Sequence, residues 1–426
     1  MKNTQQLIRE FQECRYDDLL VDIYADRERI AYENDRYIQI IQEYEKHFGG
    51  CGQVGIFSAP GRSEIGGNHT DHQHGEVLAA AINRDALAVA GIIEEPEVRI
   101  WSEGYGEIRI LLDELDKKEE EEGTTAALVR GVLAGTERER TFGGFRACVT
   151  SDVLSGAGLS SSAAFETLIG TIVSGLYFDS SLDAVKIAMI GQYAENVYFG
   201  KPCGLMDQMA CSIGSLVHID FADPQKPLVS QVSCNLDRYG YSLCITDTKG
   251  SHADLTEDYA AIPDEMKQIS ACFGKEVLRE VSKKDLLEHM NQIREQAGDR
   301  AVLRAIHFVE ENERVQKEVA ALQKDDFARF LELVQESGNS SFKYLQNVYS
   351  NHDVEQQSVS IALAISDSVL GKKGVSRVHG GGFAGTIQAF VQNEAVADYK
   401  RAMDMIFGPS SCNVLKIRKY GGMKVL

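Results

Sequence analysis

The chain has 426 residues, 43% of them hydrophobic, and a formal net charge of -20 at pH 7. This composition suits a globular protein of roughly two to three domains, and the negative charge disfavours nucleic acid as a partner. No apolar run approaches the ~18 residues of a membrane helix, and the start "MKNTQQLIREFQECRYDDLL" lacks the apolar core of a signal peptide. The nine cysteines are scattered without CxxC pairs, so we expect reduced thiols, no disulfide framework and a cytoplasmic location.

Residues 1–48 have the pattern of amphipathic helices. Apolar residues recur there at helical spacing among many charges, which predicts two or three helices. The apolar positions include Leu7, Phe11, Leu19, Leu20 and Ile23. From about Val54 the pattern changes to short β-like runs punctuated by glycine, such as "VGIFSAPG" and "ALAVAGII".

The middle and the end of the chain mix both periodicities. "TFGGFRACVTSDV" predicts a strand, which is followed by a glycine loop and a helix through "AAFETLIGTIVSGLYF". A second long helical region covers residues 284–346, and "GVSRVHGGGFAGTIQAFV" joins two β-rich segments through glycines. Since there are no repeats and no low-complexity linker, the mixture predicts an α+β protein with two lobes.

The loop "GAGLSSSAAFE" at residues 156–166 is the most informative stretch. Gly156 and Gly158 allow a tight turn that exposes backbone N–H groups, and Ser160, Ser161 and Ser162 add hydroxyls. A helix begins directly afterwards, and the N-terminus of a helix attracts anions. The loop is neither a Walker A loop, which needs GK[ST], nor a dinucleotide fingerprint, which needs a third glycine. An ordinary helix cap is the alternative, but the triple serine favours phosphate binding.

The segment "GNHTDHQHG" at residues 67–75 gathers three histidines and an aspartate within six positions. They are His69, Asp71, His72 and His74. A metal site, a catalytic cluster and a plain surface loop are all compatible with this composition. No cysteine or further carboxylate in the loop completes a closed metal shell, which disfavours the metal site.

Four segments in register resemble the GHMP family of small-molecule kinases and, within it, the galactokinases. "APGRSEIGGNHTDH" at residues 59–72 is similar to the galactokinase pattern APGRVNLIGEHTDY, and "GAGLSSSAAFE" follows at residues 156–166. "AENVYFGKPCGLMDQMACSIG" at residues 194–214 resembles the segment that holds the catalytic aspartate, and "RVHGGGFAGT" at residues 377–386 resembles the glycine-rich RxTGGGFGG. The resemblance implies two α+β lobes with the active site in the cleft between them. It also implies ATP and a small-molecule sugar as ligands, with no nucleic-acid or membrane partner, and it leaves the oligomeric state open.

The resemblance assigns catalytic roles to Asp207, in "GLMDQ", and to Arg62. Asp207 would orient the anomeric hydroxyl of the sugar and accept its proton. Whether it is a full base or mainly positions the hydroxyl stays open, because a loose transition state needs proton removal only late. Arg62 would lie near both Asp207 and the transferred phosphoryl group and would stabilise the developing charge.

The resemblance also assigns the nucleotide and metal contacts. The loop around Gly158 and Ser161 would cradle the phosphates, in the N-terminal lobe. Ser162 and Glu195 match the family's Mg²⁺-contacting serine and glutamate, and one carboxylate, one hydroxyl, phosphate oxygens and water suit that ion. The third motif, in the second lobe, would brace the phosphate loop and close the site.

The resemblance also implies a role for the histidine-rich loop at residues 67–75, which would bind the sugar. His69 and Asp71 would hydrogen-bond sugar hydroxyls rather than a metal. Gly204 lies in the same segment as Asp207 and is expected at the sugar, and Tyr259, in "TEDYAA", matches a tyrosine that contacts it.

The sugar loop departs from the galactokinase pattern in several places. Asn68 stands where galactokinases carry a glutamate that accepts a hydrogen bond from the C6 hydroxyl of the sugar, and His72 stands where they carry tyrosine. "HTDHQ" is also similar to the HIDHQ of galacturonokinases, and a neutral Asn68 would tolerate a C6 carboxylate that a glutamate repels. On this alignment, Asn68→Glu should raise the preference for galactose over galacturonate by roughly ten-fold or more. Because the catalytic segment "KPCGLMDQ" is so similar to that of galactokinases, we expect a galactokinase, with a sugar-1-kinase for galacturonate or another galactose-like sugar as the alternative.

A non-catalytic sensor that binds sugar and ATP is an alternative from a different functional class. The intact "GLSSSAA", Glu195 and Asp207 speak against it. In domain terms we expect an N-terminal helical extension at residues 1–48, an N-terminal kinase domain at 49–214 with the sugar and phosphate loops, and a C-terminal kinase domain at 215–426.

Overall fold

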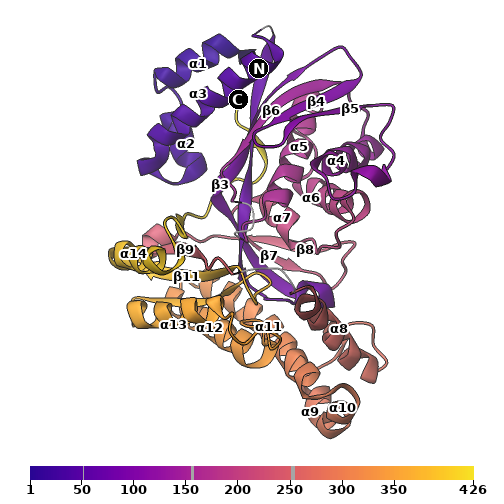
Figure 1. Cartoon of the computed structure of the whole chain (residues 1–426), viewed down its shortest axis with the longest axis vertical. Coiled ribbons are helices and arrows are strands. Elements are labelled where there is room, and N and C mark those ends of the chain that lie inside the picture. The colour runs from indigo at the N-terminus through magenta and orange to yellow at the C-terminus, as the bar shows by residue number, and fades with distance from the viewer. Residues whose placement is uncertain (51, 155–157, 251–254) are drawn as a thin grey trace.

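The structure is a computed structural model that describes residues 1–50, 52–154, 158–250 and 255–426. Within these residues the chain forms a nine-stranded sheet and a four-stranded sheet, each covered by helices. Figure 1 shows the two sheets in an upper and a lower lobe, with the chain crossing between the lobes more than once. The predicted α+β class with two lobes is therefore confirmed.

The upper sheet is built around two long strands, β2 (Gln53–Gly66) and β3 (Glu76–Ile92). Its main order is β1-β2-β3-β6-β4-β5, with β13 on β2, β7 on β3 and β8 on β7. The other strands are β1 (Lys2–Asn3), β4 (Glu97–Ser102), β5 (Gly106–Leu111), β6 (Phe145–Ser151), β7 (Leu216–Asp220), β8 (Leu228–Val232) and β13 (Met423–Lys424). Nearly every residue of β2 and β3 is buried, because helices cover both faces of the sheet.

One face of the upper sheet carries the N-terminal helices α1 (Thr4–Gln12), α2 (Asp17–Tyr24) and α3 (Ile30–Phe48), and the other carries α4 to α7 (Figure 1). These latter helices are α4 (Thr125–Glu139), α5 (Ser161–Tyr177), α6 (Ala184–Tyr193) and α7 (Met206–Ile213). The helices predicted over residues 1–48 are thus present, and their apolar side chains pack with those of β2 and β3 in one core cluster.

A buried carboxylate also fastens the N-terminal helices to the sheet. Asp85, on β3, lies 2.6 Å from Nη1 of Arg36 and 2.9 Å from Nη1 of Arg418, and it accepts a hydrogen bond of 2.8 Å from the Tyr24 hydroxyl. Burial alone would raise the pKa of Asp85, but the two guanidinium groups lower it far below its ordinary value. The ionic contacts therefore join the extension, the sheet and the C-terminal segment at one point.

The lower sheet has the order β10-β11-β9-β12, with all neighbours antiparallel. Its strands are β9 (Tyr241–Asp247), β10 (Gly374–His379), β11 (Thr386–Gln392) and β12 (Cys412–Leu415). The helices of this lobe are α8 (Thr256–Cys272), α9 (Lys283–Glu288), α10 (Met290–Ala297), α11 (Asp299–Gln323), α12 (Phe327–Ser340), α13 (Ser358–Leu370) and α14 (Val396–Phe407).

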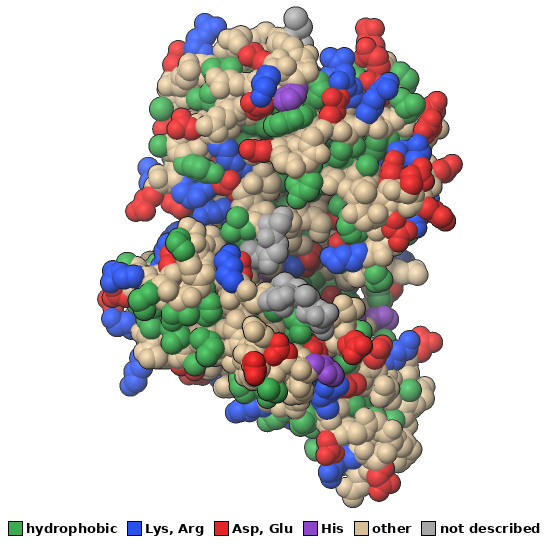
Figure 2. All heavy atoms as spheres, in the orientation of Figure 1, with side chains coloured by type: hydrophobic (Ala, Val, Ile, Leu, Met, Phe, Trp, Pro, Cys, Tyr) green, Lys and Arg blue, Asp and Glu red, His purple; other side chains and the backbone are tan. Residues whose placement is uncertain are grey.

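The predicted boundary between residues 214 and 215 does not separate the two sheets. β7 and β8 follow that boundary, yet β7 pairs with β3 in the upper sheet, and β13 at the end of the chain pairs with β2. The edges of β2 and β3 supply the backbone partners that these strands need, so the lower sheet begins only at β9. Figure 2 shows acidic and basic side chains interspersed over the visible face of both lobes. No helix in the described ranges combines the length and the apolar composition needed to cross a membrane.

Candidate active site

Arg62 and Asp207 form a two-pronged ion pair between β2 and the first turn of α7. Nε and Nη2 of Arg62 each lie 2.6 Å from an oxygen of the Asp207 carboxylate. Burial alone would lower the pKa of Arg62, but Asp207 reverses this and raises it. The guanidinium also donates through Nη1 to the carbonyl of Gly158, so it joins the aspartate to the glycine loop. The two predicted catalytic residues are therefore brought together.

The glycine loop leads directly into the N-terminus of α5. Gly158 has φ +68°, and a Cβ added there would lie 2.7 Å from Oγ1 of Thr386 and 3.0 Å from Nδ1 of His379. Only glycine fits this combination of backbone and space. The third motif therefore packs against the glycine loop, as the resemblance implied. Gly156, predicted to belong to the same anion site, lies outside the described residues.

The three serines of the loop have different surroundings. Ser160 has φ +59° and donates from Oγ to Oδ2 of Asp207 at 2.6 Å, so its hydroxyl is turned toward the aspartate. Ser161 and Ser162 lie in the first turn of α5, and the backbone N–H groups and dipole at the N-terminus of a helix favour an anion. The loop thus has the geometry of an anion site, with one of its hydroxyls used to hold Asp207.

A cavity of about 500 Å³ opens beside Ser161 and Ser162. Its walls combine apolar side chains with serines, threonines and Glu103, and they come from several elements far apart in the sequence. They include Tyr105, Leu128, Val149, Val153, Phe165 and Phe199. No local pattern joins these residues, so sequence reasoning did not find them.

Ser162 and Glu195 converge on one point near the loop. Oγ of Ser162 lies 3.4 Å from Oε1 of Glu195, which also receives Nζ of Lys201 at 3.2 Å. The other oxygen of Glu195 accepts a hydrogen bond of 2.9 Å from Gln208. Neighbouring ligands of an octahedral Mg²⁺ at its usual bond length lie about 2.9 Å apart. One hydroxyl and one carboxylate at this spacing fit such an ion, once the Lys201 side chain, which is 63% exposed, turns aside.

A chain of hydrogen bonds orders the histidine-rich loop. His69 donates from Nε2 to the carbonyl of Gly381 at 3.0 Å, and its Nδ1 lies 3.2 Å from Nε2 of His72. Nδ1 of His72 lies 3.0 Å from a carboxylate oxygen of Asp71. Desolvation and His72 lower the pKa of His69 to about 3, so His69 is neutral and accepts through Nδ1.

Acceptors lie beside both ring nitrogens of His72, which favours its protonated form. Burial alone would lower the pKa of His72, but the Asp71 carboxylate raises it. The same pairing overcomes the effect of burial on Asp71 and lowers the pKa of that carboxyl to about 2. No group of three or more His, Cys, Asp or Glu side chains within the described ranges is arranged to hold a metal ion.

Gly204 brings the segment of Asp207 against this loop. A Cβ at Gly204 would lie 2.1 Å from Oδ2 of Asp71, so a larger residue would displace that carboxylate. The predicted sugar residues Asp71 and Gly204 are therefore neighbours. The carboxylate of Asp71 is held on one side by His72 and packs on the other against the glycine.

Asn68 and Tyr259, two other predicted sugar contacts, are engaged with the third motif. Asn68 is completely buried, and its Nδ2 donates to the carbonyl of Gly380 at 2.7 Å. Tyr259 donates to the carbonyl of Gly382 at 2.9 Å and packs edge-to-face on Phe383. Burial raises the pKa of the Tyr259 hydroxyl to about 12. Both residues therefore have contacts that shape the glycine-rich turn between β10 and β11.

Sequence reasoning missed His379, which lies at the centre of these contacts. It contacts Thr386 through Nδ1 at 2.9 Å and Ser63 through Nε2 at 3.1 Å. The signal was available, since His379 stands in "RVHGGGFAGT" at the position where the galactokinase pattern has threonine. Lys201, beside Glu195, was also missed because a lone lysine in a loop gives no signal.

Comparison with known proteins agrees with this geometry. A sequence signature described as the galactokinase galactose-binding signature matches residues 42–92, and the GHMP kinases N terminal domain matches residues 127–215. A galactokinase of Glaesserella parasuis serovar 5 (strain SH0165) is 31% identical over 359 residues, which are 83% of this chain and 89% of that protein. A galactokinase of Actinobacillus pleuropneumoniae serotype 3 (strain JL03) is 30% identical and covers 84% of this chain and 91% of its own length.

Solved structures give the same result for the fold. Lactococcus lactis galactokinase complexed with galactose superimposes with a TM-score of 0.76 at 24% identity, over 90% of this chain and 98% of that one. The mevalonate kinase of Methanococcus jannaschii has a TM-score of 0.60 at 13% identity, over 86% of this chain and 99% of its own. The matched signatures contain both the sugar loop and the phosphate loop described above. The chain therefore belongs to the galactokinase family of GHMP kinases.

Proposed function

We propose that the chain is a galactokinase, which transfers the γ-phosphoryl group of ATP to the anomeric hydroxyl of galactose. The observation that carries this proposal is the Arg62–Asp207 pair, which lies where the glycine loop and the sugar-loop segment meet. An aligned nucleophile, charge neutralisation and a place for the proton are the requirements of phosphoryl transfer. The pair offers a carboxylate and a guanidinium to meet them.

Asp207 orients the hydroxyl of the sugar and takes its proton. Its carboxylate is fixed by Arg62 and by Ser160, which donates to Oδ2 at 2.6 Å, so little reorganisation is needed when the hydroxyl arrives. Arg62 stabilises the charge that develops on the transferred group. Because Arg62 also donates to the carbonyl of Gly158, its position follows that of the phosphate loop.

ATP occupies the loop and the adjoining cavity. The phosphates lie at the N-terminus of α5, around Gly158, Ser161 and Ser162, and the base enters the cavity of about 500 Å³. The mixture of apolar and polar side chains in its walls suits a planar heterocycle that carries polar groups. The cavity lies beside the first turn of α5, so a base in the cavity and phosphates at that turn belong to one bound nucleotide.

The hydroxyl of Ser162 and the carboxylate of Glu195 are the residues that would hold Mg²⁺, and their spacing of 3.4 Å supports this. A bound Mg²⁺ neutralises phosphate oxygens and so lowers the barrier to transfer. Lys201, which contacts Oε1 in this structure, would turn aside when the metal binds. Gln208 fixes the other carboxylate oxygen, which leaves Oε1 directed at the loop.

His69, Asp71 and Gly204 form the sugar side of the site. The carboxylate of Asp71 accepts hydrogen bonds from sugar hydroxyls, and the histidine ring offers polar contacts beside it. The imidazolium of His72 favours a second candidate substrate, because a cation in this loop would attract the C6 carboxylate of galacturonate. A cytoplasmic location, where ATP is abundant, belongs to the same proposal.

The test is ADP release, measured with a coupled assay over galactose, galacturonate, other hexoses and N-acetylated sugars. We expect the highest kcat/KM with galactose and phosphorylation at the anomeric oxygen, identified by NMR of the product. A higher kcat/KM with galacturonate would replace the substrate but keep the chemistry. Binding of galactose and ATP without turnover, in folded protein with Mg²⁺, would instead identify the non-catalytic sensor.

A further inference from the structure

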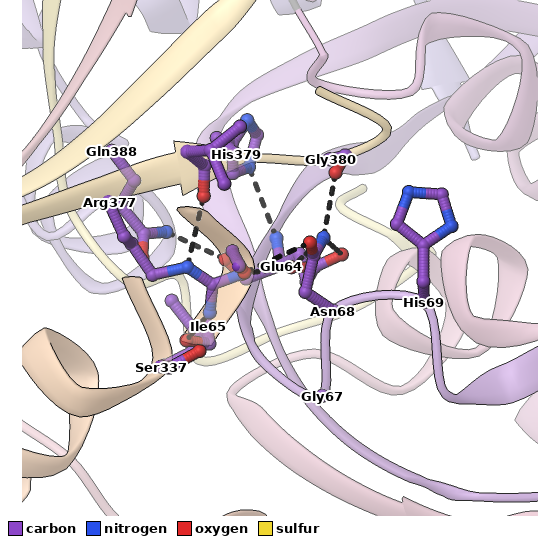
Figure 3. A network of polar contacts seen from close by, with 12 residues as sticks. Glu64, Ile65, Gly67, Asn68, His69, Ser337, Arg377, His379, Gly380 and Gln388 are labelled. Carbon is purple, nitrogen blue, oxygen red and sulfur yellow. Dashed lines mark hydrogen bonds and ion pairs between the residues drawn. The ribbon is translucent and has the colours of Figure 1, made fainter. Parts of the chain in front are cut away.

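Four departures of this chain from the galactokinase pattern lie in contact with one another. Glu64 stands where the pattern APGRVNLIGEHTDY has asparagine, and Asn68 stands where it has glutamate. Nδ2 of Asn68 lies 3.0 Å and 3.3 Å from the two oxygens of the Glu64 carboxylate (Figure 3). This chain therefore has one carboxylate and one amide at these two positions, in the opposite order to the pattern, and the two side chains are in contact. Two further departures, Ser63 and His379, contact each other at 3.1 Å.

Glu64 is paired with a buried arginine of the lower lobe. Oε1 of Glu64 receives Nη2 of Arg377, and both side chains are nearly inaccessible to solvent. Arg377 also donates to the carbonyl of Ile65 at 2.8 Å, and Gln388 donates to the carbonyl of Glu64 at 2.7 Å. Figure 3 shows Arg377 and Gln388 reaching this end of the sugar loop from the side of β10 and β11. A carboxylate that is buried and paired in this way has no freedom to bind a substrate.

The amide of Asn68 is equally occupied. Its Nδ2 serves Glu64 and the carbonyl of Gly380, and its Oδ1 accepts from Nδ2 of Asn347 at 2.8 Å. An amide offers two N–H donors and one carbonyl oxygen, so protein groups already satisfy both ends. No donor of Asn68 remains for a sugar hydroxyl.

These contacts determine where His69 lies. The carbonyl of Gly381 accepts from Nε2 of His69 at 3.0 Å and from Asn347 at 3.2 Å. Asn68 binds Gly380, the adjacent residue of the same turn, and its own carbonyl accepts from Nε2 of His307 at 3.0 Å. Asn68 and the ring of His69 are thus held by consecutive residues of one glycine turn, which belongs to the other lobe.

We propose that Asn68 is a positioning residue that does not contact the C6 group of the sugar. Together with Glu64 it holds the sugar loop against the Gly380–Gly381 turn and so determines the position of the His69 ring. The proposal rests on the proposed function in one respect, since it takes His69 to contact the sugar. It revises the expectation from the alignment that position 68 faces C6.

The first test compares galactose with 6-deoxygalactose in wild type and in Asn68→Ala. A positioning residue affects both sugars alike, so kcat/KM should fall by about 100-fold for each, as a displacement of about 1 Å can cause. The ratio between the two sugars should stay within about two-fold of wild type, which is the spread of independent effects. A ratio that falls toward one in Asn68→Ala would show that Asn68 reads the C6 hydroxyl and would overturn the proposal.

The control is Glu33→Gln, on the N-terminal extension. Glu33 is completely buried and paired with Arg29 and Arg36, so its loss destabilises the fold without touching the sugar loop. We expect a lower unfolding midpoint and an unchanged KM for galactose. Equal changes of KM in Asn68→Ala and Glu33→Gln would mean that instability alone explains the effect, which contradicts a positioning role.

The second test does not depend on activity. Unfolding by urea is measured for Glu64→Asn, for Asn68→Glu and for the variant with both changes. Asn68→Glu places two buried carboxylates together, and Glu64→Asn leaves Arg377 without its partner, whereas the double exchange restores one carboxylate and one amide. We expect the double variant to be more stable than the sum of the single changes by about ten-fold in the unfolding constant. Additive effects would disprove the pairing. If the wild-type protein phosphorylated no sugar, that result would disprove only the proposed function.

Discussion

Replacing Asp207 separates catalysis from binding more sharply than any other change in this site. Asp207→Asn keeps the volume of the side chain and removes its charge and its ability to accept a proton. Asp207→Ala removes the side chain altogether. If the carboxylate orients and deprotonates the anomeric hydroxyl, both variants should bind galactose and ATP but lose phosphoryl transfer.

The size of the effect follows from the contacts of the carboxylate. Loss of an acid–base group costs ~10²–10⁴-fold in rate, which is about 3–5 kcal/mol in the barrier. The carboxylate also accepts two contacts of 2.6 Å from Arg62 and one of 2.6 Å from Ser160. Removing it leaves the largely buried guanidinium without its partner, which costs about 1.5–3 kcal/mol of stability for a hydrogen bond to a charged group. A protein with an unfolding free energy of about 5–15 kcal/mol stays folded after such a loss.

The assay combines ADP release with calorimetry. Turnover is measured at saturating galactose and ATP, and the Kd of galactose is measured without nucleotide. Glu265→Gln is the matched control, because Glu265 forms ion pairs of 2.5–2.8 Å with Arg300 and Arg304 in the lower lobe, outside the catalytic pair. It should lower the unfolding midpoint and leave kcat unchanged.

Two results would refute the reasoning about Asp207. Turnover of Asp207→Ala close to that of wild type would remove the aspartate from the mechanism. A loss of galactose binding as large as the loss of kcat/KM, in folded protein, would make Asp207 a ligand of the ground state rather than a group that acts in transfer.

Three other predictions concern the metal, the N-terminal extension and the pH dependence. Activity should depend on a divalent metal, and Glu195→Ala should lose the response to Mg²⁺ in a titration; full activity in excess chelator would contradict the metal site. Asp85→Asn removes the carboxylate that Arg36 and Arg418 share and should cost about 3–5 kcal/mol in urea unfolding, with the largest part of the loss visible above the ordinary carboxyl pKa; an unchanged midpoint would mean that these ion pairs contribute no stability. The pKa of His72 is raised by Asp71, so the stability that this pair contributes is complete below the ordinary histidine pKa of about 6.5 and is lost as pH rises through the raised value. Between about pH 6 and about pH 9, the unfolding midpoint should therefore fall less with rising pH in His72→Gln than in wild type. An equal pH dependence in the two proteins would argue against a protonated His72.

The sequence by itself determined the parts of this protein that depend on short stretches of chain. The helical period in residues 1–48 predicted α1 to α3, and the glycine-serine run predicted a loop that ends at the N-terminus of α5. The four motifs in register indicated the family and predicted that Arg62 and Asp207 lie in one site. These predictions succeed because helix periodicity, loop flexibility and motif order are all written in neighbouring residues.

The tertiary structure alone decided which groups these residues meet. The partner of Glu64 is Arg377, which lies 313 residues away in sequence, and the walls of the cavity come from several separate elements. The upper sheet takes strands from both sides of the predicted domain boundary, because β7 and β13 find their partners on β3 and β2. The alignment predicted a sugar contact at Asn68, and the fold adds hydrogen bonds from its side chain to Glu64 on β2 and to Gly380 and Asn347 of the lower lobe. Hydrogen-bond and ion-pair partners are chosen by proximity in the folded chain, and a single sequence does not contain that proximity.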